Sequence, residues 1–111
     1  MKLPPESVIA PEKVWNYLLL PQVRGDKSQF LALAGYTLAH AEQLLEDLRK
    51  QILPLDATLR ESSKFGDKYE IRGVLTGPNG NQLRVRTFWM KDADSSVTRF
   101  ITLVPNRRMA L

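Results

Sequence analysis

The spacing of apolar residues changes along the chain at Pro54. Before Pro54, apolar residues recur every three or four positions, which is the period of one helix face. After Pro54, apolar and polar residues alternate, as in strands that bury one face of a sheet. The sequence therefore predicts an α+β fold in which helices precede a sheet.

Three helices are predicted before Pro54. The first begins at Pro11, since proline is tolerated in a first helical turn, and Pro21 ends it. The second lies in the stretch KSQFLALAG and ends at Gly35, a residue suited to a left-handed helix cap. Thr37 can cap the third helix. The apolar stripe of this third helix consists of Leu38, Ala41, Leu44, Leu45, Leu48 and Ile52.

Four strands are predicted after Pro54, over residues 55–62, 67–76, 82–91 and 97–104. Short polar or glycine-containing segments separate them, so we expect consecutive strands to pair as an antiparallel meander. We also expect the three N-terminal helices to pack on one face of this sheet.

The whole chain is expected to form one domain, because 111 residues fall in the usual size range of one. Residues 1–10 contain two prolines in succession and are predicted to form an extended arm. Residues 11–105 form the α+β domain, and residues 106–111 a C-terminal tail.

The turn sequence GPNG, residues 77–80, sets the register of the central hairpin. A three-residue loop with Gly80 in the left-handed conformation places Gly77 opposite Asn81. A two-residue turn would shift the pairing by one position and set apolar residues against charged ones. The expected pairs on the apolar face are Leu75 with Leu83, Gly73 with Val85, Ile71 with Thr87 and Tyr69 with Trp89. Those on the opposite face are Val74 with Arg84, Arg72 with Arg86 and Glu70 with Phe88.

This register gathers arginines on the face that the helices leave open. Arg72 and Arg86 stand directly opposite each other and repel, and Glu70 can offset part of that repulsion diagonally. Guanidinium groups match phosphate oxygens and stack on bases, so the face is a candidate anion- or RNA-binding surface. Its candidate residues are Arg72, Arg84, Arg86 and Arg99, although alternation leaves the face of Arg99 open. A solvated face whose arginines pair with Glu70 and its neighbours explains the pattern equally well.

Charge and composition narrow the function classes. The net charge of +4 arises entirely within residues 55–111, which suits nucleic acid or an acidic partner. The chain has no cysteine and one histidine, so we expect no thiol catalysis, metal site or cofactor. It shows no secretory signal and no span of about 20 apolar residues, so we expect a soluble, cytoplasmic protein without membrane contact.

Two residues are candidates for catalysis. His40 falls near the start of the third helix, where the helix N-terminus disfavours imidazolium and a neutral base results. Lys27 opens the second helix. The alternatives are an exposed first-turn histidine and a lysine whose stem covers apolar surface.

Four stretches, KVWNYLL, GDKSQFLALAGYT, KFGDKYEIRGVLTGPNGNQLRVRTFW and TRFITLVP, carry a resemblance. From about Ile9 to Pro105 the chain resembles a bacterial family of small domains of unknown function, found alone and at the ends of toxin-like chains. The order of helices and a meander is also similar to the barnase, colicin and RelE-like ribonuclease superfamily. That resemblance implies metal-independent RNA cleavage on the open sheet face, but no predicted strand here carries a histidine.

The sequence thus supports two readings. In the first, the basic sheet face binds or cuts RNA, with Lys27 or His40 at the rim. In the second, the domain has no catalytic role and docks a small acidic partner protein or a second copy of itself. The oligomeric state is left open.

Overall fold

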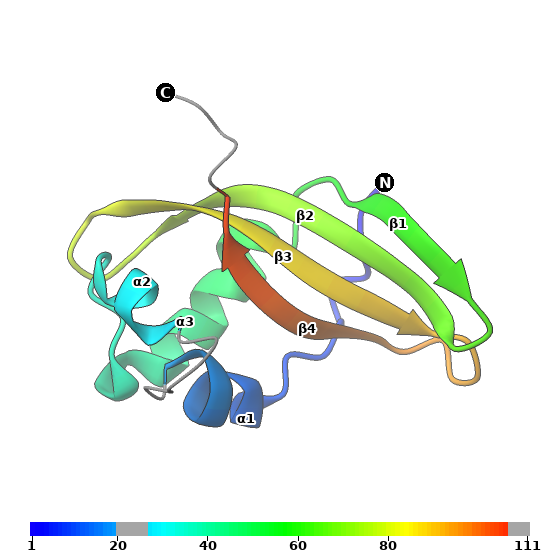
Figure 1. Ribbon diagram of the computed structural model, residues 1–111, viewed down its shortest axis with the longest axis horizontal. Helices are drawn as coiled ribbons and strands as arrows, with labels where there is room; N and C mark the ends of the chain where they lie inside the picture. Colours follow the sequence, from blue (N-terminus) through cyan, green and yellow to red (C-terminus); the bar gives the residue numbers. More distant parts are fainter. Residues whose placement is uncertain (20–26, 107–111) are drawn as a thin grey trace.

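The chain forms a four-stranded antiparallel sheet with short helical segments on one side of it (Figure 1). The computed structural model describes residues 1–19 and 27–106, apart from the side chain of Asn16. The strands pair in the order β1-β2-β3-β4, so the predicted α+β class and antiparallel meander are confirmed. Their bounds are β1 (Thr58–Ser63), β2 (Gly66–Thr76), β3 (Gln82–Asp92) and β4 (Thr98–Pro105).

The prediction of three regular N-terminal helices was wrong. The helical residues lie mid-chain, after residues 1–10, and form α1 (Pro11–Lys13), α2 (Ser28–Ala32) and α3 (Ala41–Asp47), with π turns η1 (Val14–Leu18) and η3 (Leu48–Ile52) and the 3-10 turn η2 (Leu38–His40). The expected end of the first helix at Pro21 lies outside the described residues.

The π turns occur where two neighbouring apolar residues are both buried. In both, a backbone N–H bonds five residues back, from Leu19 to Val14 and from Leu53 to Leu48. Each turn ends in two neighbouring apolar residues that are both buried, Leu18 with Leu19 and Ile52 with Leu53. A regular α-helix would separate such neighbours around its axis by about 100°. The wider turn accompanies the burial of both residues of each pair.

Residues 1–10 are packed along the domain. The N–H of Val8 donates to the Thr98 carbonyl and the Val8 carbonyl accepts from the Phe100 N–H, both at 2.8 Å, so the arm pairs with the outer edge of β4. At the other edge of the sheet, Lys2 forms a bridge with Asp56. The expected tail, residues 106–111, lies outside the described residues except for Asn106.

The central hairpin has the predicted register throughout. Gly77 donates to the Asn81 carbonyl at 3.0 Å, Gly80 has a φ of 88°, and Arg72 lies opposite Arg86. A Cβ on Gly77 would stand 2.1 Å from the Ala34 carbonyl oxygen, so this glycine also allows the hairpin to approach α2. The register predicted from a three-residue loop at residues 78–80 is therefore confirmed.

One irregularity in β4 decides the face of Arg99. The pairing with β3 shifts between Phe88 and Trp89, so that Ile101 is an extra residue on β4. Phe100 and Leu103 are therefore both buried although three positions separate them. Arg99 pairs with Met90 and so lies on the same face as Arg86.

The core lies between the sheet and the helical segments. It combines residues of the inward sheet face with apolar residues of the helical region and the arm. Trp89 is completely buried there and donates its indole N–H to Thr87 Oγ1 at 2.8 Å. The opposite face of the sheet, which we call the outward face, carries Glu70, Arg72, Val74, Arg84, Arg86, Phe88, Met90 and Arg99.

Candidate anion-binding site

The centre of the outward face is a buried carboxylate surrounded by three guanidinium groups. The side chain of Glu70 is 1% exposed. Arg60 donates from Nε to Glu70 Oε1 at 2.6 Å, and Arg72 and Arg86 donate from Nε to Oε2 at 3.0 and 2.5 Å. We call Glu70 and these three arginines the arginine cluster.

Local backbone structure brings the cluster together. Arg72 and Arg86 are cross-strand partners, and Glu70 precedes Arg72 by two positions and so lies on the same face. Arg60 comes from a different place, because the register between β1 and β2 shifts between Leu59 and Glu61. At that bulge Arg60 is the extra residue, and its side chain reaches Glu70.

The ionisation of Glu70 follows from these contacts. Burial alone raises its pKa, but the hydrogen bonds from Arg86, Arg60 and Arg72 outweigh burial and lower the pKa to about 2. Glu70 is therefore a carboxylate at neutral pH. It also offsets the repulsion between Arg72 and Arg86 that the register creates.

The cluster retains excess positive charge. Three guanidinium groups share one carboxylate, and each uses its Nε–H for that contact. Within residues 1–19 and 27–106, the Nη groups of these three arginines have no protein partner at hydrogen-bond distance. The arginine side chains are between 34% and 48% exposed, so the ends of the guanidinium groups reach solvent.

An aromatic side chain lies next to the cluster. The guanidinium carbon of Arg86 and the ammonium of Lys68 each lie 5.2 Å from the centre of the Phe88 ring. Such contacts stabilise a cation against a ring face and hold its direction. The outward face thus interleaves cations with apolar groups.

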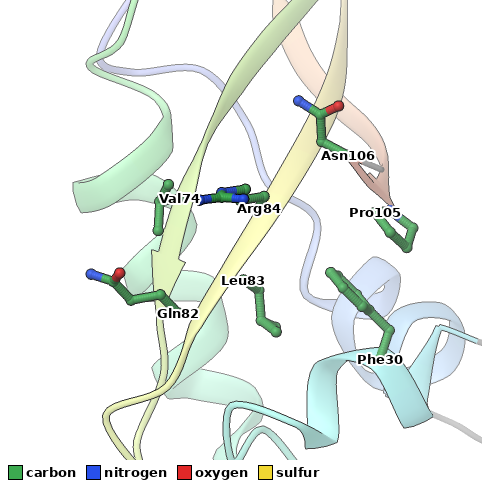
Figure 2. Close-up of a pocket in the computed structure, with 7 residues that line it drawn as sticks. All are labelled: Phe30, Val74, Gln82, Leu83, Arg84, Pro105 and Asn106. Carbon is green, nitrogen blue, oxygen red and sulfur yellow. The ribbon is translucent and has the colours of Figure 1, made fainter. Parts of the chain in front are cut away.

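The remaining two arginine candidates lie at opposite ends of the outward face. Arg99 donates to Asp92 Oδ2 at 3.2 Å, so its charge is partly compensated. Arg84 lies opposite Val74 and lines a pocket beyond the end of β4, with Phe30 reaching toward it from α2 (Figure 2). The structure therefore brings Arg72 and Arg86 into one cluster and leaves Arg84 and Arg99 beside it.

Neither catalytic candidate contacts the arginine cluster. Lys27 donates to the Tyr17 hydroxyl at 2.9 Å and lies over the Tyr17 ring. The hydrogen bond from Lys27 lowers the pKa of Tyr17, and a second one from Thr102 adds to it. His40 shares a 2.9 Å hydrogen bond between its Nδ1 and Thr37 Oγ1.

The part of the chain that is described offers few other groups for acid–base or metal chemistry. Tyr36 donates to buried Asp47 at 2.6 Å, and burial followed by that hydrogen bond raises the pKa of the tyrosine. This pair ties the residues after α2 to α3. Among residues 1–19 and 27–106, no three His, Cys, Asp or Glu side chains gather in a way that could hold a metal ion. No helix in the same residues is long and apolar enough to cross a membrane.

Sequence reasoning missed two residues of the outward face. Arg60 lies within the strand predicted over residues 55–62, but its link to Glu70 depends on a bulge that no residue pattern signalled. Asn106 was assigned to the tail, yet its backbone N–H continues the pairing of β4 by donating to Arg84 at 2.9 Å. The polar residue directly after Pro105 was the sequence signal that could have placed Asn106 at the end of the fourth strand.

Comparison with known proteins gives a family but no activity. The chain matches the model of a domain of unknown function, DUF6883, over residues 3–107, and therefore belongs to that family. No curated protein and no solved structure matches the chain.

Proposed function

We propose, for this member of the DUF6883 family, that the outward face binds single-stranded RNA through the arginine cluster and holds it without cutting it. The observation that carries the proposal is the common use of Nε by Arg60, Arg72 and Arg86. Glu70 anchors each guanidinium at its inner edge and leaves the Nη edge directed to solvent. That edge offers two parallel donors to a phosphate.

Preorganisation favours this use. A long arginine side chain loses about 2 kcal/mol of rotamer freedom when a ligand fixes it. In the cluster, the contact with Glu70 and the Phe88 ring already restrict Arg86. Less entropy is then lost on binding, and the affinity for an anion rises.

Single-stranded RNA fits better than duplex DNA. Proteins that bind single strands combine a basic track with apolar and aromatic side chains against which bases pack. Phe88 and Met90 provide such groups on the same face as the arginines. The outward face is a strand surface, with no helix to enter a major groove.

The arrangement supports binding over cleavage. A general base acts best with a pKa near the working pH, and the pKa of Glu70 is about 2. Glu70 is also enclosed by three guanidinium groups. The contacts of Lys27 and His40 are with Tyr17 and Thr37, so they supply no acid or base to the cluster.

The test is the salt dependence of RNA binding. Fluorescence anisotropy with a labelled oligouridine of about 12 nucleotides measures affinity at salt concentrations from about 50 to about 200 mM. Replacing Arg72 and Arg86 by glutamine should lower the affinity at least about tenfold. It should also reduce the slope of log K against log salt by about 1.4, or 0.7 for each lost phosphate contact.

The matched control is the double variant Lys13→Gln with Lys50→Gln, which removes the same charge from the helical side of the molecule. It should retain the slope and most of the affinity. If both double variants bind alike, the arginine cluster is not the site. Gel analysis of the recovered oligonucleotide should show uncut RNA.

The same assay separates the competing class of partner. If no RNA binds but an acidic polypeptide such as polyglutamate binds and is lost in the Arg72 and Arg86 variant, the face docks an acidic protein. That result would replace the RNA proposal.

A further inference from the structure

The turn between β1 and β2 and the turn between β3 and β4 lie side by side at one end of the sheet (Figure 1). Residues of both turns line a pocket of about 400 Å³, a volume in the range of pockets that hold small ligands. The ion pair of Arg99 with Asp92 on the outward face forms part of its wall. The other lining residues are Lys64, Phe65, Ala93 and Asp94. The pocket therefore continues the outward face beyond Met90.

Phe65 presents an aromatic ring to solvent at this pocket. The residue is 72% exposed, at a turn position that small or polar residues usually occupy. Its backbone is held on both sides, because its N–H donates to Ser63 Oγ at 3.1 Å and its carbonyl accepts from the Ala93 N–H at 3.0 Å. Gly66 follows with a φ of 146°, a conformation that only glycine adopts readily. The ring is thus exposed on a backbone whose position is fixed.

The charges around the pocket favour an uncharged, planar ligand. A single exposed apolar side chain is common on protein surfaces, so the exposure of Phe65 selects no ligand by itself. The two cations of the lining, Lys64 and Arg99, are matched in number by two carboxylates, Asp92 and Asp94. A phosphate gains little from surroundings in which the charges cancel. A nucleobase is uncharged and stacks on an aromatic side chain through its own face.

We propose that Phe65 stacks on one base of the RNA strand that the outward face binds, whichever base that is. The inference rests on the proposed function and extends it from phosphate contacts to a base contact. Arg86 and Met90 lie four positions apart on the same face, which corresponds to about 13 Å along β3. Met90 in turn pairs with Arg99, which lines the pocket. A strand held at the arginine cluster can therefore continue along β3 to Phe65. Every base has an aromatic face, so the contact adds affinity for single strands of any sequence.

The experiment compares two labelled strands of about 12 units by anisotropy, oligouridine and a strand whose sugars carry no bases. Phe65→Leu removes the ring and keeps an apolar side chain. It should lower the affinity for oligouridine about tenfold, the size expected for one stacked base, and leave the affinity for the base-free strand unchanged. The salt slope should also stay the same, because no phosphate contact is lost.

Two further variants are the matched controls. Phe65→Tyr keeps an aromatic ring and should bind both strands as the wild-type protein does. Leu59→Ala truncates another exposed apolar side chain, on β1, and should also leave both affinities unchanged. A tenfold loss that is confined to Phe65→Leu and to oligouridine identifies the ring as a contact to a base.

Each result separates the two proposals. Equal binding of oligouridine by the wild-type protein and Phe65→Leu overturns the stacking contact and leaves the RNA-binding face intact. An equal loss of affinity for both strands also overturns it, since the ring then contributes without contacting a base. If neither strand binds the wild-type protein, both proposals fail. Should Phe65→Leu not fold, oligouridine must quench the fluorescence of Phe65→Trp more strongly than that of the wild-type protein, and the base-free strand must not.

Discussion

Glu70 and Asn106 are two buried polar side chains of the outward face with opposite hydrogen-bonding environments. Glu70 accepts hydrogen bonds from three arginines. Asn106 has no side-chain partner among the described residues. Both are at most 5% exposed, so burial does not distinguish them.

The difference separates a buried charge that the protein satisfies internally from a buried amide that it leaves unpaired. At Glu70 the protein satisfies a buried charge internally, and the surrounding cations become ordered at the surface. At Asn106 the cost of an unpaired amide remains in the folded protein. Removing each group should therefore change stability in opposite directions.

The largest expected effect is that of Glu70→Gln. It removes the charge that three guanidinium groups share, and loss of one partner from a buried ion pair costs about 3 kcal/mol. Urea denaturation followed by circular dichroism measures the change in the free energy of unfolding. Glu61→Gln, on exposed β1, is the control and should change it by less than about 0.5 kcal/mol. Equal effects of the two variants would contradict the central role of Glu70.

A somewhat smaller effect is expected from acid. The folded-state pKa of Glu70 is about 2, below the ordinary value of 4.5, so its contribution is present above pH 4.5 and is lost as the pH falls toward 2. Between pH 5 and pH 3, the protein should lose about 2 kcal/mol more than Glu70→Gln loses. Parallel stability curves for the two proteins would show that Glu70 does not titrate in this way.

The smallest expected effect has the opposite sign. Asn106→Leu replaces an unpaired amide by an apolar group of similar size and should stabilise the protein by about 1 kcal/mol. Thermal unfolding in the absence of RNA measures it as a rise in Tm. A fall in Tm would mean that the Asn106 amide is satisfied in the folded protein, and the contrast with Glu70 would disappear.

The central hairpin shows how far residue pattern alone reaches. Its register follows from a side-chain period of two and from the turn at Gly80, and both are local properties. The β4 strand lacks such a constraint, since Phe100 and Val104 alternate with Ile101 and Leu103. A bulge at Ile101 lets Phe100 and Leu103 both enter the core, and this also determines the face of Arg99.

The helical half was less predictable for a related reason. The apolar spacing indicated helix correctly, but neighbouring apolar pairs such as Ile52 and Leu53 are buried together through π turns. Whether a helix stays regular depends on the shape of the core space that the sheet and the arm leave for its side chains. Periodicity reports which residues are apolar and carries no information on that space.

By itself, the sequence determined the α+β class, the pairing of β2 with β3 and the presence of arginines on one face of that hairpin. These depend on alternation and turn chemistry over short distances along the chain. Only the tertiary structure decided that Arg60 joins the cluster, that Glu70 becomes buried and that Asn106 closes a pocket with Phe30. Those features join segments that are remote in sequence through bulges and strand ends, where local pattern no longer specifies which groups meet.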